Sequence, residues 1–163
     1  MNTVCTGATV MTLDIGTPMS VSGDNTGALV NPFLGAPVVW EAFTTSACAD
    51  VTVAYCGTSP AFAGSLNTLG VGCPLTNLVF NSNANFQTGT CGDGDVNFAI
   101  LFPALPAGTY YFPVLEGTGS SGPYTLTFSA VACSGTAPAN ALCSAAVELV
   151  PSENCTPVAG TVE

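Results

Sequence analysis

Apolar and polar residues alternate along short segments of this chain, and the alternation predicts β-strands. In such segments the apolar side chains share one face, because successive side chains of a strand point to opposite sides. Gly, Pro, Asn and Ser separate the segments at intervals of about ten residues, which is typical of tight turns. Strands are predicted over residues 9–13, 19–22, 38–45, 51–55, 78–80, 96–102, 110–115 and 124–130.

Three of the predicted strands carry the clearest apolar faces. These faces consist of Phe98, Ile100 and Phe102, of Tyr110, Phe112 and Val114, and of Tyr124, Leu126, Phe128 and Ala130. Short strands that each bury one face are typical of two antiparallel sheets packed together. The pattern therefore predicts an all-β fold, a jelly-roll-like antiparallel β-sandwich over residues 1–133.

The stretch between residues 56 and 95 differs from the rest. It is rich in Gly, Asn, Ser and Thr and holds three cysteines, which favours long loops stapled by disulfides over strands packed on a core. A Cys73–Cys91 bond would close a loop of 18 residues and stabilise the fold by about 3 kcal/mol. Cys48 and Cys56 flank one predicted strand, so an extended chain would hold them too far apart to pair.

The charge composition excludes several kinds of catalytic and binding site. The chain has 163 residues, a charged fraction of 6 % and a formal charge of −10, because it contains no Lys, Arg or His. Histidine-based catalysis, histidine metal ligands and basic phosphate clamps are therefore excluded. Nucleic-acid binding and attraction to anionic lipid need basic residues and are not expected. No apolar run approaches the about 20 residues of a membrane span, so membrane insertion is not expected either.

A pair of carboxylates could in principle catalyse glycoside hydrolysis. The acids outside obvious turns are Glu41, Asp50, Glu116 and Glu148. Nothing in the pattern places two of them in one cleft, so no enzymatic activity is expected. Trp40 is expected in the core rather than on a sugar-binding surface. Because Glu41 lies between Trp40 and Ala42, its side chain is expected to point to solvent.

The cysteine count indicates disulfides and an oxidising compartment, so the protein is expected to be secreted or displayed on a cell surface. Metal thiolates are the competing interpretation, but no C-x-x-C spacing and no histidine are present. The eight cysteines are Cys5, Cys48, Cys56, Cys73, Cys91, Cys133, Cys143 and Cys155. Asp93 and Asp95 on a Gly-rich stretch could hold Ca²⁺, although a solvated turn is the simpler interpretation. No other cofactor is expected.

The two ends of the chain resemble each other. Residues 5–13 read CTGATVMTL and residues 143–149 read CSAAVEL. Each opening is followed by a Thr-Pro pair, at Thr17 and Thr156, and then by a glycine. The first cysteines of the two openings lie 143 − 5 = 138 residues apart, about the length of one sandwich domain. Chance similarity between Thr- and Val-rich strands is the competing explanation.

The repeat suggests that the last residues are the opening of a second copy of the domain. Residues 134–142 would then be a linker, and residues 143–163 would continue into a next repeat or add a strand to a neighbouring copy. Such a head-to-tail contact does not close and therefore forms a filament of identical copies. Cys143, Ala146, Val147, Leu149 and Val158 are the candidate polymerisation residues.

The middle of the chain supports a family resemblance. The residues that carry it are VVWEAF at 38–43, DVTVAYCG at 50–57, Phe62 to Leu66, Gly72-Cys73, GTYY at 108–111 and GPYTLTF at 122–128. In order and spacing they resemble the bacterial pre-peptidase C-terminal (PPC-like) domain. The resemblance implies a small jelly-roll sandwich, often repeated in secreted or surface proteins, without catalysis of its own. The family's acidic run is replaced here by Asn81-Ser-Asn-Ala-Asn85, which weakens any expectation of a cation site.

Together these features predict a structural subunit or repeat of an extracellular filament or surface array, with copies of itself as its partner. The alternative is an accessory module that binds glycan or a surface for a secreted enzyme or adhesin. Attached glycan is also plausible, because Asn154-Cys155-Thr156 is a glycosylation sequon.

Overall fold

The computed structural model describes residues 2–62, 68–75, 77–80, 86–88, 91, 97–117 and 120–133. The chain divides into two units, Met1–Cys133 and Ser134–Glu163, and the described residues all belong to the first. The predicted linker and the predicted extra strand segment, residues 134–142 and 143–163, lie outside the described residues.

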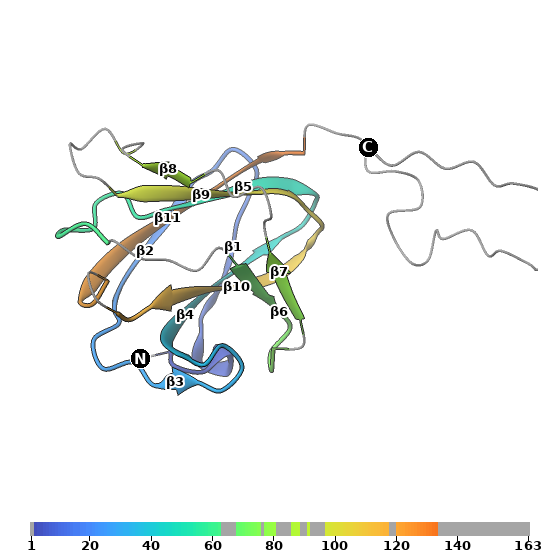
Figure 1. The fold of residues 1–163 in the computed structure, drawn as a ribbon. Coiled ribbons are helices and arrows are strands. Elements are labelled where there is room, and N and C mark those ends of the chain that lie inside the picture. The colour runs from blue at the N-terminus through green and yellow to red at the C-terminus, as the bar shows by residue number, and fades with distance from the viewer. Residues whose placement is uncertain are drawn as a thin grey trace, which may run out of the picture. The chain divides into compact units, whose positions relative to one another are not determined.

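Two β-sheets form the first unit, which confirms the predicted β-sandwich (Figure 1). One sheet has the order β1 (Val10–Thr12), β4 (Ala36–Thr45), β10 (Gly108–Leu115), β6 (Thr68–Val71) and β7 (Asn77–Phe80), and β3 (Val30–Asn31) pairs with the start of β4. The other has the order β2 (Met19–Asp24), β11 (Pro123–Ala132), β5 (Ala49–Ala54), β9 (Phe98–Leu105) and β8 (Phe86–Thr88). Strand pairing is antiparallel except between β1 and β4, which run parallel.

Every strand that the sequence predicts has a counterpart, and the three predicted apolar faces are buried. Their ten side chains all belong to the core between the sheets. Aromatic rings meet across this core, with centroids 5.4 Å apart for Phe43 and Phe128 and 4.9 Å apart for Tyr55 and Phe98. Such contacts stabilise a sandwich that has no opposite charges to pair.

A second apolar cluster covers the outer face of the first sheet. Its buried members are Cys5, Val38, Trp40, Ala42 and Tyr111, with Leu75 packed against them. Cys5 comes from η1 (Cys5–Gly7), a single 3-10 turn near the start of the chain. Trp40 is fully buried, as expected, but in this outer cluster and not between the sheets. The strand β4 is therefore covered on both faces.

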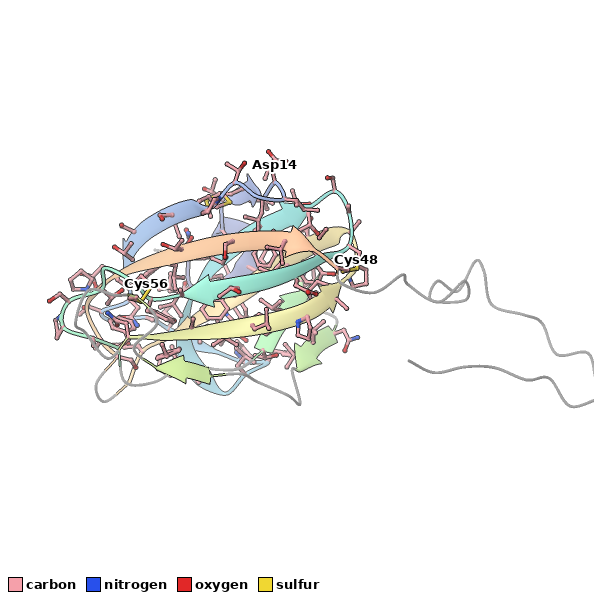
Figure 2. All side chains as sticks on the ribbon, turned by 90° about the horizontal axis from the view of Figure 1, so that it is seen from above. Asp14, Cys48 and Cys56 are labelled. Carbon is pink, nitrogen blue, oxygen red and sulfur yellow. A yellow bond between two sulfur atoms is a disulfide. The ribbon has the colours of Figure 1, made fainter. Side chains whose placement is uncertain are left out.

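Three disulfides join distant segments: Cys5–Cys73, Cys48–Cys133 and Cys56–Cys91. The suggested Cys73–Cys91 bond is wrong, because Cys73 follows β6 in the first sheet while Cys91 lies beside β8 and β9 in the second. Cys48 and Cys56 do not pair with each other, as predicted, and Figure 2 shows them at opposite ends of the sandwich. Cys143 and Cys155 lie outside the described residues.

The stretch between residues 56 and 95 is more ordered than the sequence suggested. It contributes β6, β7 and β8, and Phe62 and Leu69 are buried in the core between the sheets. The expectation of loops held only by disulfides is therefore wrong. A strand of four residues with an internal glycine at position 70 gives too weak an alternation to be recognised locally.

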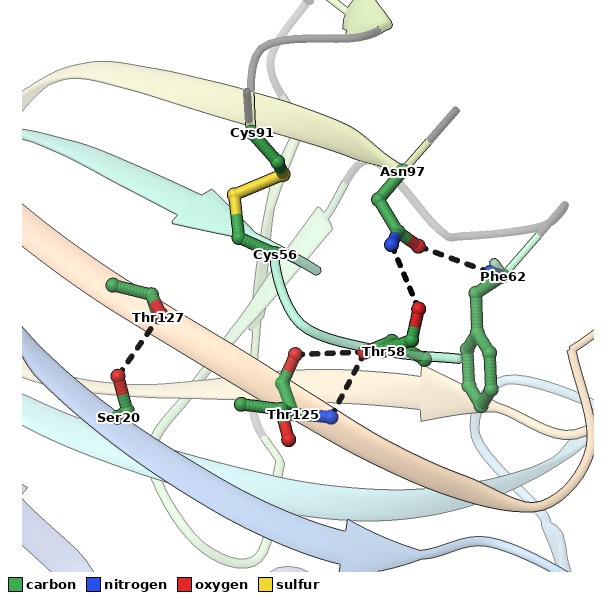
Figure 3. The surroundings of a disulfide bond; sticks show 8 residues. All are labelled: Ser20, Cys56, Thr58, Phe62, Cys91, Asn97, Thr125 and Thr127. Atoms are coloured by element: carbon green, nitrogen blue, oxygen red, sulfur yellow. Dashed lines mark hydrogen bonds between the residues drawn. A yellow bond between two sulfur atoms is a disulfide. The ribbon is translucent and has the colours of Figure 1, made fainter. Parts of the chain in front are cut away.

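Side-chain hydrogen bonds hold the loop that follows β5 (Figure 3). The Thr58 hydroxyl donates to the Thr125 carbonyl and accepts from the Thr125 N–H, each at 2.9 Å. The buried Asn97 amide donates to the Thr58 carbonyl at 2.8 Å and accepts from the Phe62 N–H at 3.2 Å. With the Cys56–Cys91 bond, these contacts fix the loop to both β11 and β9.

Candidate functional site

A pocket opens at the side of the sandwich where β1 and β2 are the edge strands of the two sheets. Its volume is about 510 Å³. Met11, Val21 and Val39 give it apolar walls, and Asp24, Glu41 and Tyr124 are among its polar lining residues. These side chains come from both sheets, so the pocket is an opening into the space between them.

The pocket lies beside β4, at the place where the N-terminal residues turn away from the sheet. The Trp40 N–H donates to the Asn2 carbonyl at 2.8 Å, and β1 rejoins β4 where Val10 pairs with Ala42. Between these points the chain leaves the sheet to form η1 over its outer face. Asn2 and Thr9, at the two ends of this excursion, both line the pocket.

Glu41 points into the pocket, so the expectation that it points to solvent is wrong. Its side chain is only 5 % exposed, and its Oε1 accepts a hydrogen bond from the Tyr124 hydroxyl at 2.6 Å. The reason lies in the second apolar cluster. Because Trp40 and Ala42 face that cluster on the outside of the sheet, the residue between them faces the interior.

Tyr124 is held in place by a glycine opposite it. Gly23 on β2 pairs directly with Tyr124 on β11, and a Cβ added at Gly23 would overlap the tyrosine hydroxyl and lie 2.5 Å from its Cζ. The missing side chain therefore lets the ring lie across β2 and reach Glu41. A strand glycine paired with a cross-strand tyrosine is the sequence signal that could have located this site.

The pKa values of the pocket's ionisable groups are shifted by burial and hydrogen bonds, with no cationic side chain nearby. Burial raises the pKa of the Glu41 carboxyl, although the hydrogen bond from Tyr124 works in the opposite direction. Burial, followed by the hydrogen bond and charge of Glu41, raises the pKa of Tyr124. At the rim, the Thr26 backbone N–H, which donates to Asp24 at 2.8 Å, holds the pKa of Asp24 below its usual value.

The N-terminal segment is anchored at three positions. Cys5 is bonded to Cys73, Ala8 packs against the outer cluster, and Leu13 is 2 % exposed in the core between the sheets. The Leu13 N–H also donates to the Thr44 carbonyl at 2.9 Å. This segment therefore occupies a defined place along β4, with side chains in both apolar clusters.

The described chain ends far from the pocket. Tyr124 lies near the start of β11, and eight residues later β11 ends at Ala132, a rise of about 26 Å. Cys133 is then tied to Cys48. Cys133, the last described residue, therefore lies at the end of β11 opposite Tyr124.

Several predicted site residues cannot be placed. Those that lie outside the described residues are Asp93, Asp95, Cys143, Ala146, Val147, Leu149, Cys155 and Val158. The ranges that are described contain no group of three acidic, Cys or His side chains that could hold a metal. Of the other acids considered for catalysis, Asp50 accepts from the Ala104 N–H and Glu116 from the Gly27 N–H.

Comparisons with known proteins give no relative. The chain matches no family model, no curated protein and no solved structure. Among the described residues there is no helix with the length and apolar character to cross a membrane. The three disulfides indicate an oxidising environment of the extracellular kind.

Proposed function

We propose that this protein is a structural subunit or repeat of an extracellular filament or surface array, built on a PPC-like sandwich. Copies assemble head to tail through residues 143–163, and the domain performs no catalysis. The partner of each copy is another copy, without nucleic acid or membrane insertion.

One observation carries this proposal: the repeated sequence keeps the anchors of the N-terminal segment. Ala146 follows Cys143 by three residues, as Ala8 follows Cys5, and Leu149 corresponds to Leu13 once a gap of two residues is allowed, because it follows its cysteine by six residues and not by eight. In the structure Cys5 forms a disulfide with Cys73, Ala8 packs against the outer cluster, and Leu13 is buried in the core between the sheets. The second segment therefore carries the side chains needed to occupy the same place along β4 of another domain.

That place is already filled within each described domain by residues 2–13. The second segment accordingly either opens the next domain of one polypeptide or adds a strand to the sheet edge of a neighbouring copy. In both arrangements backbone hydrogen bonds and apolar contacts provide the geometry. Ion pairs contribute nothing, because the chain carries no cationic side chain.

The test is truncation of the chain. Residues 1–142 alone should fold and should not assemble, whereas the full chain should form regular polymers visible by negative-stain electron microscopy. Leu149→Asp in the full chain should weaken assembly in the same way, and Val131→Asp, at an apolar residue that is 59 % exposed on β11, serves as the matched control. Polymers that form normally from residues 1–142 would rule out the proposal.

A second candidate function is an accessory glycan- or surface-binding module, and the pocket beside Glu41 is the observation that favours it. A sugar platform normally offers exposed aromatic rings. Of the side chains described, the one exposed aromatic ring is Phe33, at 52 %. Binding of the isolated monomer to a glycan array would favour this candidate, and absence of binding would leave the structural proposal alone.

A further inference from the structure

The pocket between β1 and β2 holds a buried acid that no side chain of this protein can neutralise. Glu41 is 95 % buried, since its exposed fraction is 5 %, yet the sequence contains no Lys, Arg or His. Tyr124 donates to one carboxyl oxygen. The described residues make no hydrogen bond to the second oxygen, Oε2, which is not fully buried and is therefore open to the pocket. A deeply buried carboxylate without a counter-ion is costly, so a proton, or a cation that reaches Oε2 through the pocket, would stabilise it.

The walls of the pocket select among external cations. A divalent metal needs several oxygen ligands, and the described residues bring no three metal-ligating side chains together. Met11, Val21 and Val39 form apolar walls above the single buried carboxyl. Such walls favour an aliphatic stem over a hydrated ion, because apolar surface on the ligand is removed from water there.

We propose that this pocket binds a primary ammonium group carried on an aliphatic stem, with Glu41 as its counter-ion. The ammonium donates to the free carboxyl oxygen, and the Tyr124 hydroxyl keeps the other oxygen in place. The stem lies against Met11, Val21 and Val39. At the rim, Asp24 adds a second negative charge beside the entrance. The volume of about 510 Å³ is ample for a stem of four or five carbons.

The same chemistry has two sources. One is a free aliphatic amine, and the other is a lysine side chain presented by a different protein. No side chain of a second copy can supply it, because the sequence contains no lysine. The site therefore concerns partners other than those of the proposed polymer and does not depend on polymerisation.

The test is a titration of the full chain carrying Leu149→Asp, which should remain unassembled, followed by ¹⁵N–¹H correlation NMR at low ionic strength and neutral pH. The probes are n-butylamine, Nα-acetyl-lysine N-methylamide and, as a neutral control of similar length, 1-pentanol. Saturable shifts at Met11, Val21 and Tyr124 with millimolar affinity are expected for an amine of this size. Glu41→Gln should weaken amine binding at least about tenfold, since it removes the charge and keeps the shape.

Two further variants make the result specific. Asp50→Asn removes one charge on β5, where Asp50 pairs with Val131 near the end of β11 opposite Tyr124, and should leave amine binding unchanged. Val21→Phe fills the pocket while retaining the carboxyl and should abolish binding, which keeps the test informative if Glu41→Gln does not fold. Binding by the blocked lysine as well as the amine identifies a protein partner, and binding by n-butylamine alone identifies a small amine. No saturable shift with either amine, or equal binding by 1-pentanol or by the Glu41→Gln variant, would overturn the proposal.

Discussion

Replacing Gly23 by alanine should destabilise the sandwich far more than an alanine in a strand normally does. The added Cβ would overlap the Tyr124 hydroxyl and approach Cζ to 2.5 Å and Cε1 to 3.1 Å. Tyr124 is 2 % exposed, so the ring has no open space nearby. Either β2 moves away from β11, or the ring rotates and loses its hydrogen bond to Glu41.

The size of this effect follows from two contributions. Overpacking in a filled core costs about 1–3 kcal/mol, and loss of a hydrogen bond to a carboxylate costs about 1.5–3 kcal/mol. The two costs are not fully additive, because a ring that rotates away from the added Cβ relieves the overpacking when it gives up the hydrogen bond. We therefore expect Gly23→Ala to lower the free energy of unfolding by about 2–4 kcal/mol. Gly108→Ala is the matched control, because a Cβ at this strand glycine meets nothing closer than 3.6 Å.

Urea denaturation with intact disulfides measures both variants, provided that the slope m is unchanged. Gly108→Ala should stay within about 0.5 kcal/mol of the natural chain. Equal stability of the two variants would show that Tyr124 does not lie across Gly23, and the account of how Glu41 is positioned would then fail.

Three other perturbations test separate parts of the structure. Glu41→Gln should make stability less dependent on pH. The raised pKa of Glu41 means that the folded state binds the carboxyl proton more tightly than the unfolded state does, so the natural chain should lose stability relative to the variant as the pH rises above about 4.5, the ordinary pKa. Parallel denaturation curves from pH 4 to 7 check this. Replacing both Cys5 and Cys73 by serine should cost about 4 kcal/mol, because the bond spans 68 residues; a loss below about 1 kcal/mol by the same denaturation assay would contradict the anchoring of the N-terminal segment. Asn25→Ala should cost about 3 kcal/mol or more in thermal and urea unfolding, because its buried amide donates to the Leu115 and Ser120 carbonyls at 2.7 and 2.8 Å and leaves them unsatisfied when removed.

The sheets could be predicted from the sequence because their signal is local. The alternation in strands such as 124–130 is visible within seven residues, and it correctly assigns each buried face. The strands β3, β6 and β8 were missed because two to four residues give too few positions to reveal a period. Short strands of this kind form because their neighbours in the sheet supply hydrogen bonds, which local pattern does not contain.

The pocket could not be predicted because it depends on contacts between distant segments. The orientation of Glu41 is set by the cluster around Trp40, which is completed by Cys5 and by Leu75. No spacing rule relates these positions, and the Cys5–Cys73 bond that joins them is one of many pairings that eight cysteines allow. The cross-strand pair of Gly23 and Tyr124 is likewise fixed only by the register of β2 and β11.

In the proposed assembly, residues 143–163 join one copy of this domain to the next. The most direct measurement is cryo electron microscopy of the purified native material. Regular fibres that repeat at the size of one sandwich domain are expected, with residues 143–163 joined to a sheet of the following domain. Separate particles of single domains, or fibres joined through another surface, would contradict it.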